Sequence, residues 1–183
     1  DWVGVVAGGP CAECGLDAGA TPRGELPDEL RRAARAWATL LTDTPVTRLR
    51  ARPHGTAWSA LEYGGHVDGV LEVFGLRVDR MMVEDGPELG WWDHEAAVLD
   101  DSYQQRDPAG LAHDIERDSA ALSARLMGLD DAQWSRTGMR RAGERFTVEG
   151  LARFAWHESV HHLHDASRLL AESWTAAALS TAD

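Results

Sequence analysis

Apolar residues recur at three- and four-residue steps in four long segments of the chain, and each stripe predicts an amphipathic helix. The stripe of the first segment contains Leu30, Trp37 and Leu41, and the stripe of the third contains Leu111 and Leu122. The four predicted helices span about residues 27–43, 60–84, 108–129 and 148–174. Patterns typical of β-strands are nearly absent between them.

Residues at the expected starts of these helices support the boundaries. Ser59 and Glu62 match a capping box, in which each side chain binds a free backbone N–H of the first turn. Asp107 is a suitable N-cap before Pro108, because proline is favoured at the first helical position. Thr147 is a suitable cap for the last helix.

Four amphipathic helices without strands predict an all-α fold, a four-helix bundle. The link of residues 85–107 is long, so we expect a crossover between the second and third helices instead of up-down-up-down wiring. Residues 1–25 are rich in Gly and Pro and have no apolar period. We therefore expect an irregular N-terminal arm, residues 1–25, followed by a bundle domain, residues 26–183.

Composition narrows the function. The chain has 183 residues, 44% of them hydrophobic, which suits one domain with a real core. Its 18 basic and 30 acidic residues give a net charge of -12, which argues against nucleic acid and against anionic membrane surfaces as partners. All basic residues are Arg, so lysine chemistry is excluded. No apolar run is long enough for a membrane helix and no signal-peptide pattern is present, so a cytoplasmic protein is expected.

Half of the eight histidines lie between residues 157 and 164, in the last predicted helix. His157 and His161 enclose Glu158 in an HExxH pattern, whose two imidazoles can reach one metal ion from the same helix face. In zinc proteases the glutamate is the general base. The extended protease pattern fails here, because His164 stands where its Gly belongs and Ser167 where its last His belongs. A protease is therefore disfavoured.

A third ligand could come from another helix. His66 lies at the edge of the apolar stripe of the second helix, near Tyr63, where a ligand in a bundle core belongs. His164 is the rival, although it lies about 10 Å along the helix axis from His157. His162 points about 100° away from His161 and is expected to support the ligands or pack beside them. The residues alone also allow a helix face that is merely polar.

Several stretches resemble the DinB-like superfamily of small metal-binding four-helix bundles. The run Trp58-Ser-Ala-Leu-Glu-Tyr-Gly-Gly-His66 is similar to that family's approach to its first histidine. Phe146-Thr-Val148 and His161-His-Leu-His-Asp165 are similar to the approach to, and exit from, its last pair. The resemblance covers about residues 26–174. The family includes mycothiol- and bacillithiol-dependent S-transferases and maleylpyruvate isomerase.

The resemblance implies a metal site of His66, His157 and His161 that binds Zn²⁺, Ni²⁺ or Fe²⁺. It further implies a small electrophilic substrate, mycothiol as a co-substrate whose thiolate the metal holds, and assembly as a homodimer. Glu158 would orient a ligand or act as acid/base. His162, His164, Arg153 and Tyr63 would support the ligands or bind substrate; alternatively, Arg153 simply pairs with Glu149. A metal-binding stress-response module without turnover, or a metal-dependent hydrolase using Glu158, are the alternatives.

Two other motifs lie outside these ligands. Cys11 and Cys14 form a CxxC that resembles half of a zinc knuckle, but zinc needs four ligands and no second CxxC exists. A second copy of the chain, His54 or His94 could complete a separate metal site; an ordinary arm or a redox pair are the other interpretations. Trp91 and Trp92, in the long link, are expected to plug one end of the bundle or to form a lid over the metal pocket.

Overall fold

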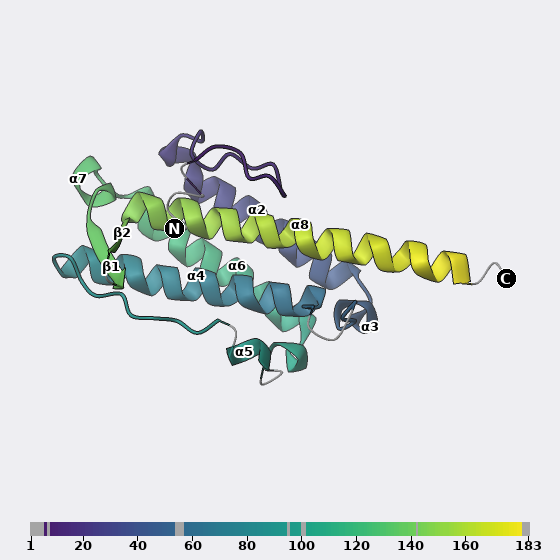
Figure 1. Cartoon of the computed structure of the whole chain (residues 1–183). Coiled ribbons are helices and arrows are strands. Elements are labelled where there is room, and N and C mark those ends of the chain that lie inside the picture. The colour runs from purple at the N-terminus through teal and green to yellow at the C-terminus, as the bar shows by residue number, and fades with distance from the viewer. Residues whose placement is uncertain are drawn as a thin grey trace.

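The computed structural model describes Val6 and residues 8–53, 57–94, 96–99, 102–141 and 143–180 (Figure 1). Four long helices form a bundle: α2 (Leu26–Asp43), α4 (Ala60–Val83), α6 (Pro108–Met127) and α8 (Val148–Ser180). Each begins within about one residue of the start predicted from the apolar stripes. The all-α, four-helix prediction is confirmed, although α8 continues six residues beyond the predicted end near Trp174.

The helices do not pack in sequence order. α2 packs against α6 and α8, and α4 packs against the same two helices, so α2 and α4 are diagonal to one another. Figure 1 shows α4 and α6 running in the same direction. An ion pair of 2.8 Å between Asp79 and Arg125, near the ends of these two helices, agrees with that. Parallel neighbours need a connection that returns along the bundle, so the predicted crossover is confirmed.

The crossover lies directly on α4. It contains the short α5 (Ala96–Leu99) and the 3₁₀ turn η2 (Tyr103–Gln105). A Cβ atom added at Gly65 would lie 2.6 Å from the ring of Tyr103, and one at Gly69 would lie 2.7 Å from the ring of Trp92. Any larger side chain at these two positions would push the crossover away from the helix. The glycines therefore place Trp92 beside the interior of the bundle.

The predicted helix caps are present. The Ser59 side chain accepts from the backbone N–H of Glu62, and the Glu62 carboxylate accepts from the backbone N–H of Ser59 at 2.8 Å. The Asp107 carboxylate accepts from the Gly110 backbone N–H at 2.8 Å, and the Thr147 hydroxyl accepts from the Gly150 backbone N–H at 2.9 Å. These three signals could be recognised from the sequence because they are local.

The segment between α6 and α8 contains strands, although patterns typical of β-strands are nearly absent from the sequence. It holds α7 (Asp131–Trp134) and a two-stranded antiparallel hairpin, β1 (Thr137–Arg141) and β2 (Glu144–Thr147). An isolated hairpin is marginal in water, so tertiary contacts decide whether these strands form. Here the Leu89 backbone N–H donates to the Met139 carbonyl at 2.6 Å, and Phe146 is buried. A second short helix, α3 (Val46–Leu49), lies in the connection before α4.

The described part of the arm packs on the bundle. Residues 8–22 form turns and bends, followed by the 3₁₀ turn η1 (Arg23–Glu25). Val6 and Ala18 are buried with the hydrophobic core. The Arg153 guanidinium on α8 donates to the backbone carbonyls of Ala18 and, at 2.8 Å, of Thr21. The arm is thus fastened along α8.

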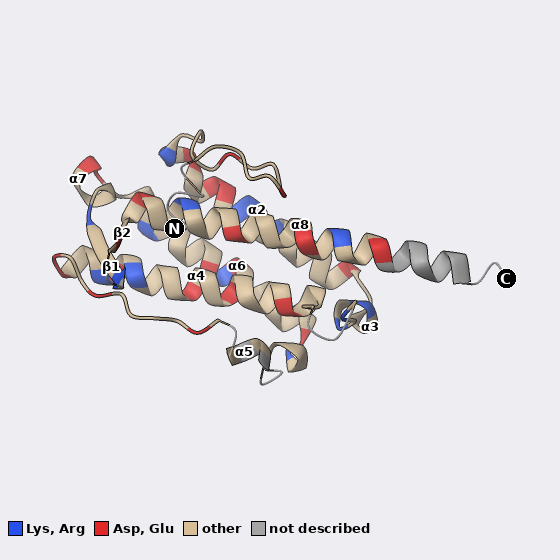
Figure 2. Ribbon diagram, viewed as in Figure 1, with Lys and Arg blue, Asp and Glu red and all other residues tan. Residues whose placement is uncertain are grey.

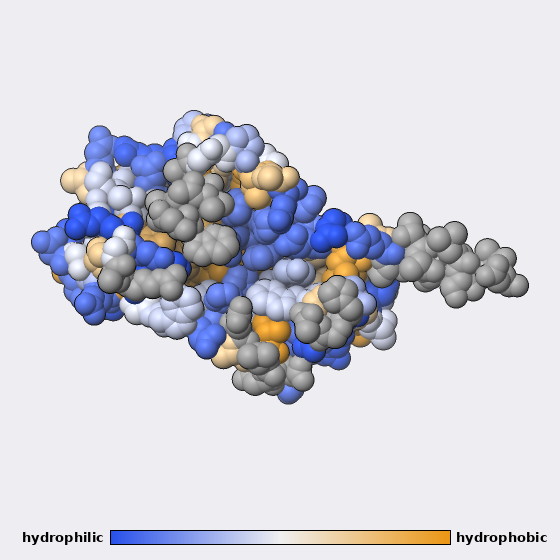
Figure 3. All heavy atoms as spheres, viewed as in Figure 1, coloured by the Kyte–Doolittle hydropathy of each residue, from blue (hydrophilic) through white to orange (hydrophobic). Residues whose placement is uncertain are grey.

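Acidic and basic residues are spread along all four long helices (Figure 2), and the face in Figure 3 is mostly hydrophilic with small hydrophobic areas. Among the described residues, no helix is both long enough and apolar enough to cross a membrane.

Candidate metal centre

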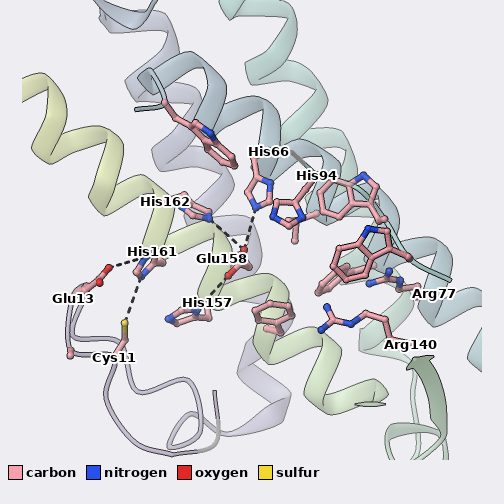
Figure 4. A pocket seen from close by; sticks show the side chains of 17 residues that line it. Cys11, Glu13, His66, Arg77, His94, Arg140, His157, Glu158, His161 and His162 are labelled. Carbon is pink, nitrogen blue, oxygen red and sulfur yellow. Dashed lines mark hydrogen bonds and ion pairs between the residues drawn. The ribbon is translucent and has the colours of Figure 1, made fainter. Parts of the chain in front are cut away.

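A pocket of about 440 Å³ opens between α4, α8, the crossover and the arm (Figure 4). Aromatic and histidine side chains dominate its wall. In and beside it, histidine, acidic and cysteine side chains form three groups whose ligand atoms lie within 4.8 Å of one another; one group, His161, His162 and Asp165, shares its histidines with the other two. We call the other two the His–Glu–His cluster, which is His66, Glu158 and His162, and the Cys–His cluster, which is Cys11, Cys14, His157 and His161.

The His–Glu–His cluster joins α4 to α8. The Glu158 carboxylate lies between the two imidazoles, with Oε2 3.2 Å from His66 Nε2 and 3.4 Å from His162 Nε2. Two nitrogen or oxygen ligands on one zinc ion are about 3.3 Å apart, given bonds of about 2.05 Å at tetrahedral angles. The buried His66 and Glu158 and the half-buried His162 therefore match a divalent cation in both donor type and spacing.

Neighbouring side chains fix the His162 ring. The Asp165 carboxylate lies 3.2 Å from His162 Nδ1, which leaves Nε2 directed at Glu158. Tyr63 stacks on the same ring with centroids 5.3 Å apart. A carboxylate on the second nitrogen is a common support for a histidine ligand, because it fixes the tautomer and the ring orientation. Tyr63, which was predicted to support the ligands or bind substrate, thus contacts the His162 ring.

Two tryptophans cover His66. Trp92 stacks on the His66 ring at 5.5 Å with an interplanar angle of 11°, and Trp58 lies tilted against it at 5.3 Å. Trp91 also lines the pocket but is 59% exposed. Of the two interpretations of the tryptophan pair, the lid over the metal pocket agrees with the position of Trp92.

Electrostatics at this cluster favour positive charge. Burial opposes ionisation of Glu158, but the three neighbouring histidines, His157, His162 and His66, bring the pKa of Glu158 well below its usual range. Burial lowers the pKa of His66, which favours its neutral form. Burial also acts to lower the pKa of His162, but Asp165 and Glu158 outweigh it and raise that pKa to about 9. The carboxylates thus stabilise a cation at His162, and a metal ion would supply positive charge at the same place.

The Cys–His cluster joins the arm to the neighbouring face of α8. Cys11 Sγ lies 3.6 Å from His161 Nδ1, and Cys14 Sγ lies 4.0 Å from His157 Nε2. The backbone N–H of Cys14 and the His157 side chain lower the pKa of Cys11 to about 6. Burial raises the pKa of Cys14. The structure thus gives the two cysteines histidine partners within the same chain; His94 lies elsewhere in the pocket, and His54 is outside the described residues.

The three metal ligands implied by the resemblance are divided between these clusters. His66 lies with Glu158 and His162, whereas His157 and His161 face the arm. The physical reason is that two overlapping pairs, 157 with 161 and 158 with 162, share the spacing of one helical turn. Packing of α8 against α4 turns the second pair toward His66. Glu158 consequently lies between His66 and His162.

Two other predicted site residues lie away from the His–Glu–His cluster. His164 is exposed and lies in a second, shallow pocket with Glu13, Asp165 and Arg168. Arg153 pairs with Glu149 at 2.7 Å and donates to the arm, which agrees with the alternative interpretation of this residue.

The structure also brings residues to the pocket that sequence reasoning did not single out. They are Trp58, Arg77, Arg140 and, as a residue of this pocket, His94; Asp165 lies outside the pocket lining and contacts His162. The His94 ring lies 5.4 Å from the His66 ring and belongs to neither cluster. Glu158 lies four residues before His162 and Asp165 three residues after it, and this helical spacing could have predicted that both carboxylates contact that histidine. The others come from separate elements, so no local pattern could have found them.

Two arginines line the side of the pocket opposite Cys11 and His161 (Figure 4). Arg77 is 5% exposed, and among the described residues no carboxylate pairs with it; its Nη2 donates to the Gly90 carbonyl at 3.1 Å and its Nε has no partner. Burial, helped by the charge of Arg140, lowers the pKa of Arg77 to about 10, so it stays protonated at neutral pH. Arg140 pairs with Glu144 at 2.7 Å.

Comparisons with known proteins agree with the fold. The model of the DinB superfamily matches residues 29–166. A solved structure, YfiT from Bacillus subtilis, is described as a probable metal-dependent hydrolase with an unusual four-helix bundle topology. The two structures are similar with a TM-score of 0.72 and 20% sequence identity, covering 80% of this chain and 85% of the Bacillus chain. No curated protein sequence gives a significant match.

Proposed function

The chain belongs to the DinB superfamily. From that premise we propose that it is a divalent-metal-dependent enzyme that uses a low-molecular-weight thiol. It either adds this thiol to a small electrophilic molecule or uses the thiol to isomerise that molecule. The metal ligands are His66, Glu158 and His162. The observation that carries this proposal is the convergence of these three buried or half-buried side chains, with N···O distances of 3.2 and 3.4 Å, on a 440 Å³ pocket.

Two imidazoles and one carboxylate suit Zn²⁺, Ni²⁺ or Fe²⁺. Bound there, such an ion would keep a coordinated thiol in its nucleophilic thiolate form at neutral pH. The residues of the chain hold the ligands in place: Asp165 and Tyr63 fix His162, and Trp92 fixes His66. The resemblance to mycothiol-dependent S-transferases supports a thiol co-substrate of that type.

The arginine side of the pocket favours an electrophile that carries an anionic group. A buried guanidinium without a counter-ion is costly, and a substrate carboxylate beside Arg77 would remove that cost. Arg140 adds positive charge on the same side of the pocket, while its pairing with Glu144 fixes its position. The pocket therefore combines a metal-binding side with an anion-binding side.

His94 is our candidate for the residue that transfers the proton of the reaction. Its ring lies 5.4 Å from His66 and 5.8 Å from Trp92, within the pocket, and it belongs to neither ligand cluster. An imidazole outside the ligand sets can act as a general acid or base. His94 would protonate the carbon next to the new C–S bond, or accept that proton in an isomerisation.

Metal-dependent hydrolysis is the second candidate. The description of the Bacillus protein favours it, and the same three ligands could serve a bound water. Against it, Glu158 is held between two histidines and is not free to act as a general base. A metal-binding module without turnover remains the third possibility.

The test is conjugation of monochlorobimane with mycothiol by the metal-loaded protein. We expect turnover that His162→Ala abolishes and His164→Ala leaves unchanged, because His164 is an exposed histidine on the same helix outside both clusters. Cysteine and bacillithiol in place of mycothiol test the choice of thiol. Ester or amide hydrolysis without any thiol conjugation would establish the hydrolase instead.

A further inference from the structure

The CxxC turn of the arm presents both thiols to α8. The Gly15 backbone N–H donates to the Cys11 carbonyl, and the Cys11 N–H donates to the Leu16 carbonyl, both at 2.9 Å. Gly15, directly after the second cysteine, has a φ of 74°, which favours glycine. These contacts close a compact turn, so that the two cysteines lie on one side of it, opposite His157 and His161.

We propose that Cys11, Cys14, His157 and His161 form a Cys₂His₂ zinc site that fastens the arm to α8. Zinc binds thiolate sulfur at about 2.3 Å and imidazole nitrogen at about 2.0–2.1 Å, which places sulfur and nitrogen about 3.6 Å apart at a tetrahedral angle. The observed S···N distances are 3.6 Å for Cys11 with His161 and 4.0 Å for Cys14 with His157. The four donors thus surround a space of the right size for one ion.

The donor set identifies the class of metal and its role. Thiolate and imidazole together favour Zn²⁺ over Mg²⁺ or Ca²⁺, which take oxygen ligands. Four protein ligands complete the tetrahedral shell and leave no position for substrate, which is the arrangement of structural zinc sites. Binding displaces the protons of both thiols to solvent. The site differs in this respect from the His–Glu–His cluster, which supplies three ligands.

Carboxylates already orient the two histidines for this role. Glu13 and Asp165 lie 3.3 and 3.5 Å from His161 Nε2, so Nδ1 is the nitrogen turned toward Cys11. His157 directs Nε2 at Cys14, while its buried Nδ1 lies 3.8 Å from Glu158 Oε1 and has no hydrogen-bond partner. Zinc on Nε2 would fix the proton on Nδ1, facing the Glu158 carboxylate.

The consequence is a fixed wall for the pocket. Cys11, Ala12 and Glu13 line the same 440 Å³ pocket as His66 and Glu158. Arg153 fastens the arm at Ala18 and Thr21, and the zinc site would fasten it again at the mouth of the pocket. The zinc site stands on its own donors and does not depend on the proposed reaction.

Zinc content per chain tests the proposal. The full chain is loaded with Zn²⁺ under a phosphine reductant, dialysed and analysed by plasma mass spectrometry. We expect about two zinc ions for the wild type and about one after Cys11→Ser with Cys14→Ser. His66→Ala should also leave about one zinc ion, the one in the Cys–His cluster. His164→Ala should leave both zinc ions bound. An unchanged zinc content in the double cysteine variant overturns this site, whereas an unchanged content in His66→Ala overturns the His–Glu–His centre.

Cobalt substitution tests the cysteine ligands directly, because the absorption spectrum of Co²⁺ reports which atoms bind the ion. Co²⁺ in the wild-type protein should give an intense thiolate-to-cobalt band in the near ultraviolet and the visible bands of tetrahedral cobalt. Both should persist in His66→Ala and be absent from the double cysteine variant. Cobalt spectra without thiolate bands, or cysteines that form a disulfide and take up no metal after reduction, would show the proposal to be wrong.

Proteolysis of the arm tests whether the zinc site fastens the arm to α8. Glu13 lies between the cysteines and its side chain is 71% exposed, so a glutamate-specific protease can test access to this turn. Removing zinc with a chelator should accelerate cleavage after Glu13 by about tenfold or more, because local opening then no longer requires release of the metal. The chelator should have no such effect on the double cysteine variant. Equal cleavage rates with and without zinc in the wild type would contradict the fastening.

Discussion

Replacing Glu62 by Gln tests whether one buried carboxylate fixes the start of α4, which carries His66. The Glu62 side chain is fully buried and accepts hydrogen bonds from Arg52, from Gln104 at 2.9 Å, and from both the backbone N–H and the hydroxyl of Ser59 at 2.8 Å. Although burial opposes ionisation, these donors lower the pKa of Glu62 from 4.5 to about 2. The network joins the connection before α4, the crossover and the helix start.

The magnitude follows from linkage. Because the folded pKa lies below the unfolded value, the stabilisation is fully present above about pH 5 and is lost as the pH falls through 4.5 toward 2. A difference of about 2.5 pK units corresponds to roughly 3 kcal/mol at pH 7 and to roughly 1 kcal/mol at pH 3. Glu62→Gln should therefore be most destabilising at neutral pH and progressively less so in acid.

Urea unfolding at several pH values between 7 and 3 measures this difference. A chelator in every sample keeps metal release from contributing. Glu84→Gln is the matched control, because Glu84 pairs with Arg80 across one exposed turn of the same helix and should show only a small effect. A difference between Glu62→Gln and wild type that stays constant from pH 7 to pH 3 would refute the reasoning.

Three further predictions concern the packing of the bundle, one buried hydrogen bond and the binding of an anionic substrate. Gly69→Ala should lower stability by about 1–3 kcal/mol and weaken metal binding, because the added Cβ would lie 2.7 Å from Trp92. Gly75→Ala should raise stability by up to about 1 kcal/mol, because the nearest neighbour of its Cβ is the tip of an arginine side chain at 3.4 Å. Urea unfolding measures the sign of both changes. Trp37→Phe should cost about 1–3 kcal/mol, because it removes the 2.8 Å hydrogen bond from Nε1 to the Ser159 carbonyl; calorimetry that finds no loss would contradict this. Arg77→Met should raise the KM for a carboxylate-bearing electrophile by about tenfold or more and leave the KM for its neutral amide unchanged, as steady-state kinetics can establish.

Helical spacing alone could not determine which side chains of α8 meet His66. The sequence predicted a metal site between α8 and His66 on α4, but α8 contains two overlapping pairs of candidate ligands, and the members of each pair are one turn apart. Spacing cannot choose between the pair of His157 with His161 and the pair of Glu158 with His162, because both have the same period. Packing of α8 against α4 brings Glu158 and His162 to His66, whereas His157 and His161 lie with Cys11 and Cys14.

Local signals determined the rest of what could be predicted. Apolar stripes and caps such as Ser59 with Glu62 gave the four helices, because helix formation depends on residues within one or two turns. The crossover was predicted from the length of the link, and the resemblance indicated the superfamily. The hairpin after α6 was not predicted, because the contacts of Leu89 and Phe146 that stabilise it come from distant segments.

The sequence by itself determined the helices, their caps, the long crossover and the presence of metal-binding side chains. The tertiary structure alone decided which of them meet. It turned Glu158 and His162 toward His66, brought Cys11 and Cys14 across some 140 residues to His157 and His161, and placed Arg77 without a counter-ion in the same pocket. The physical reason is that a helical period fixes positions only relative to the helix axis. The rotation of each helix in the bundle is set by burial of its apolar face against the others.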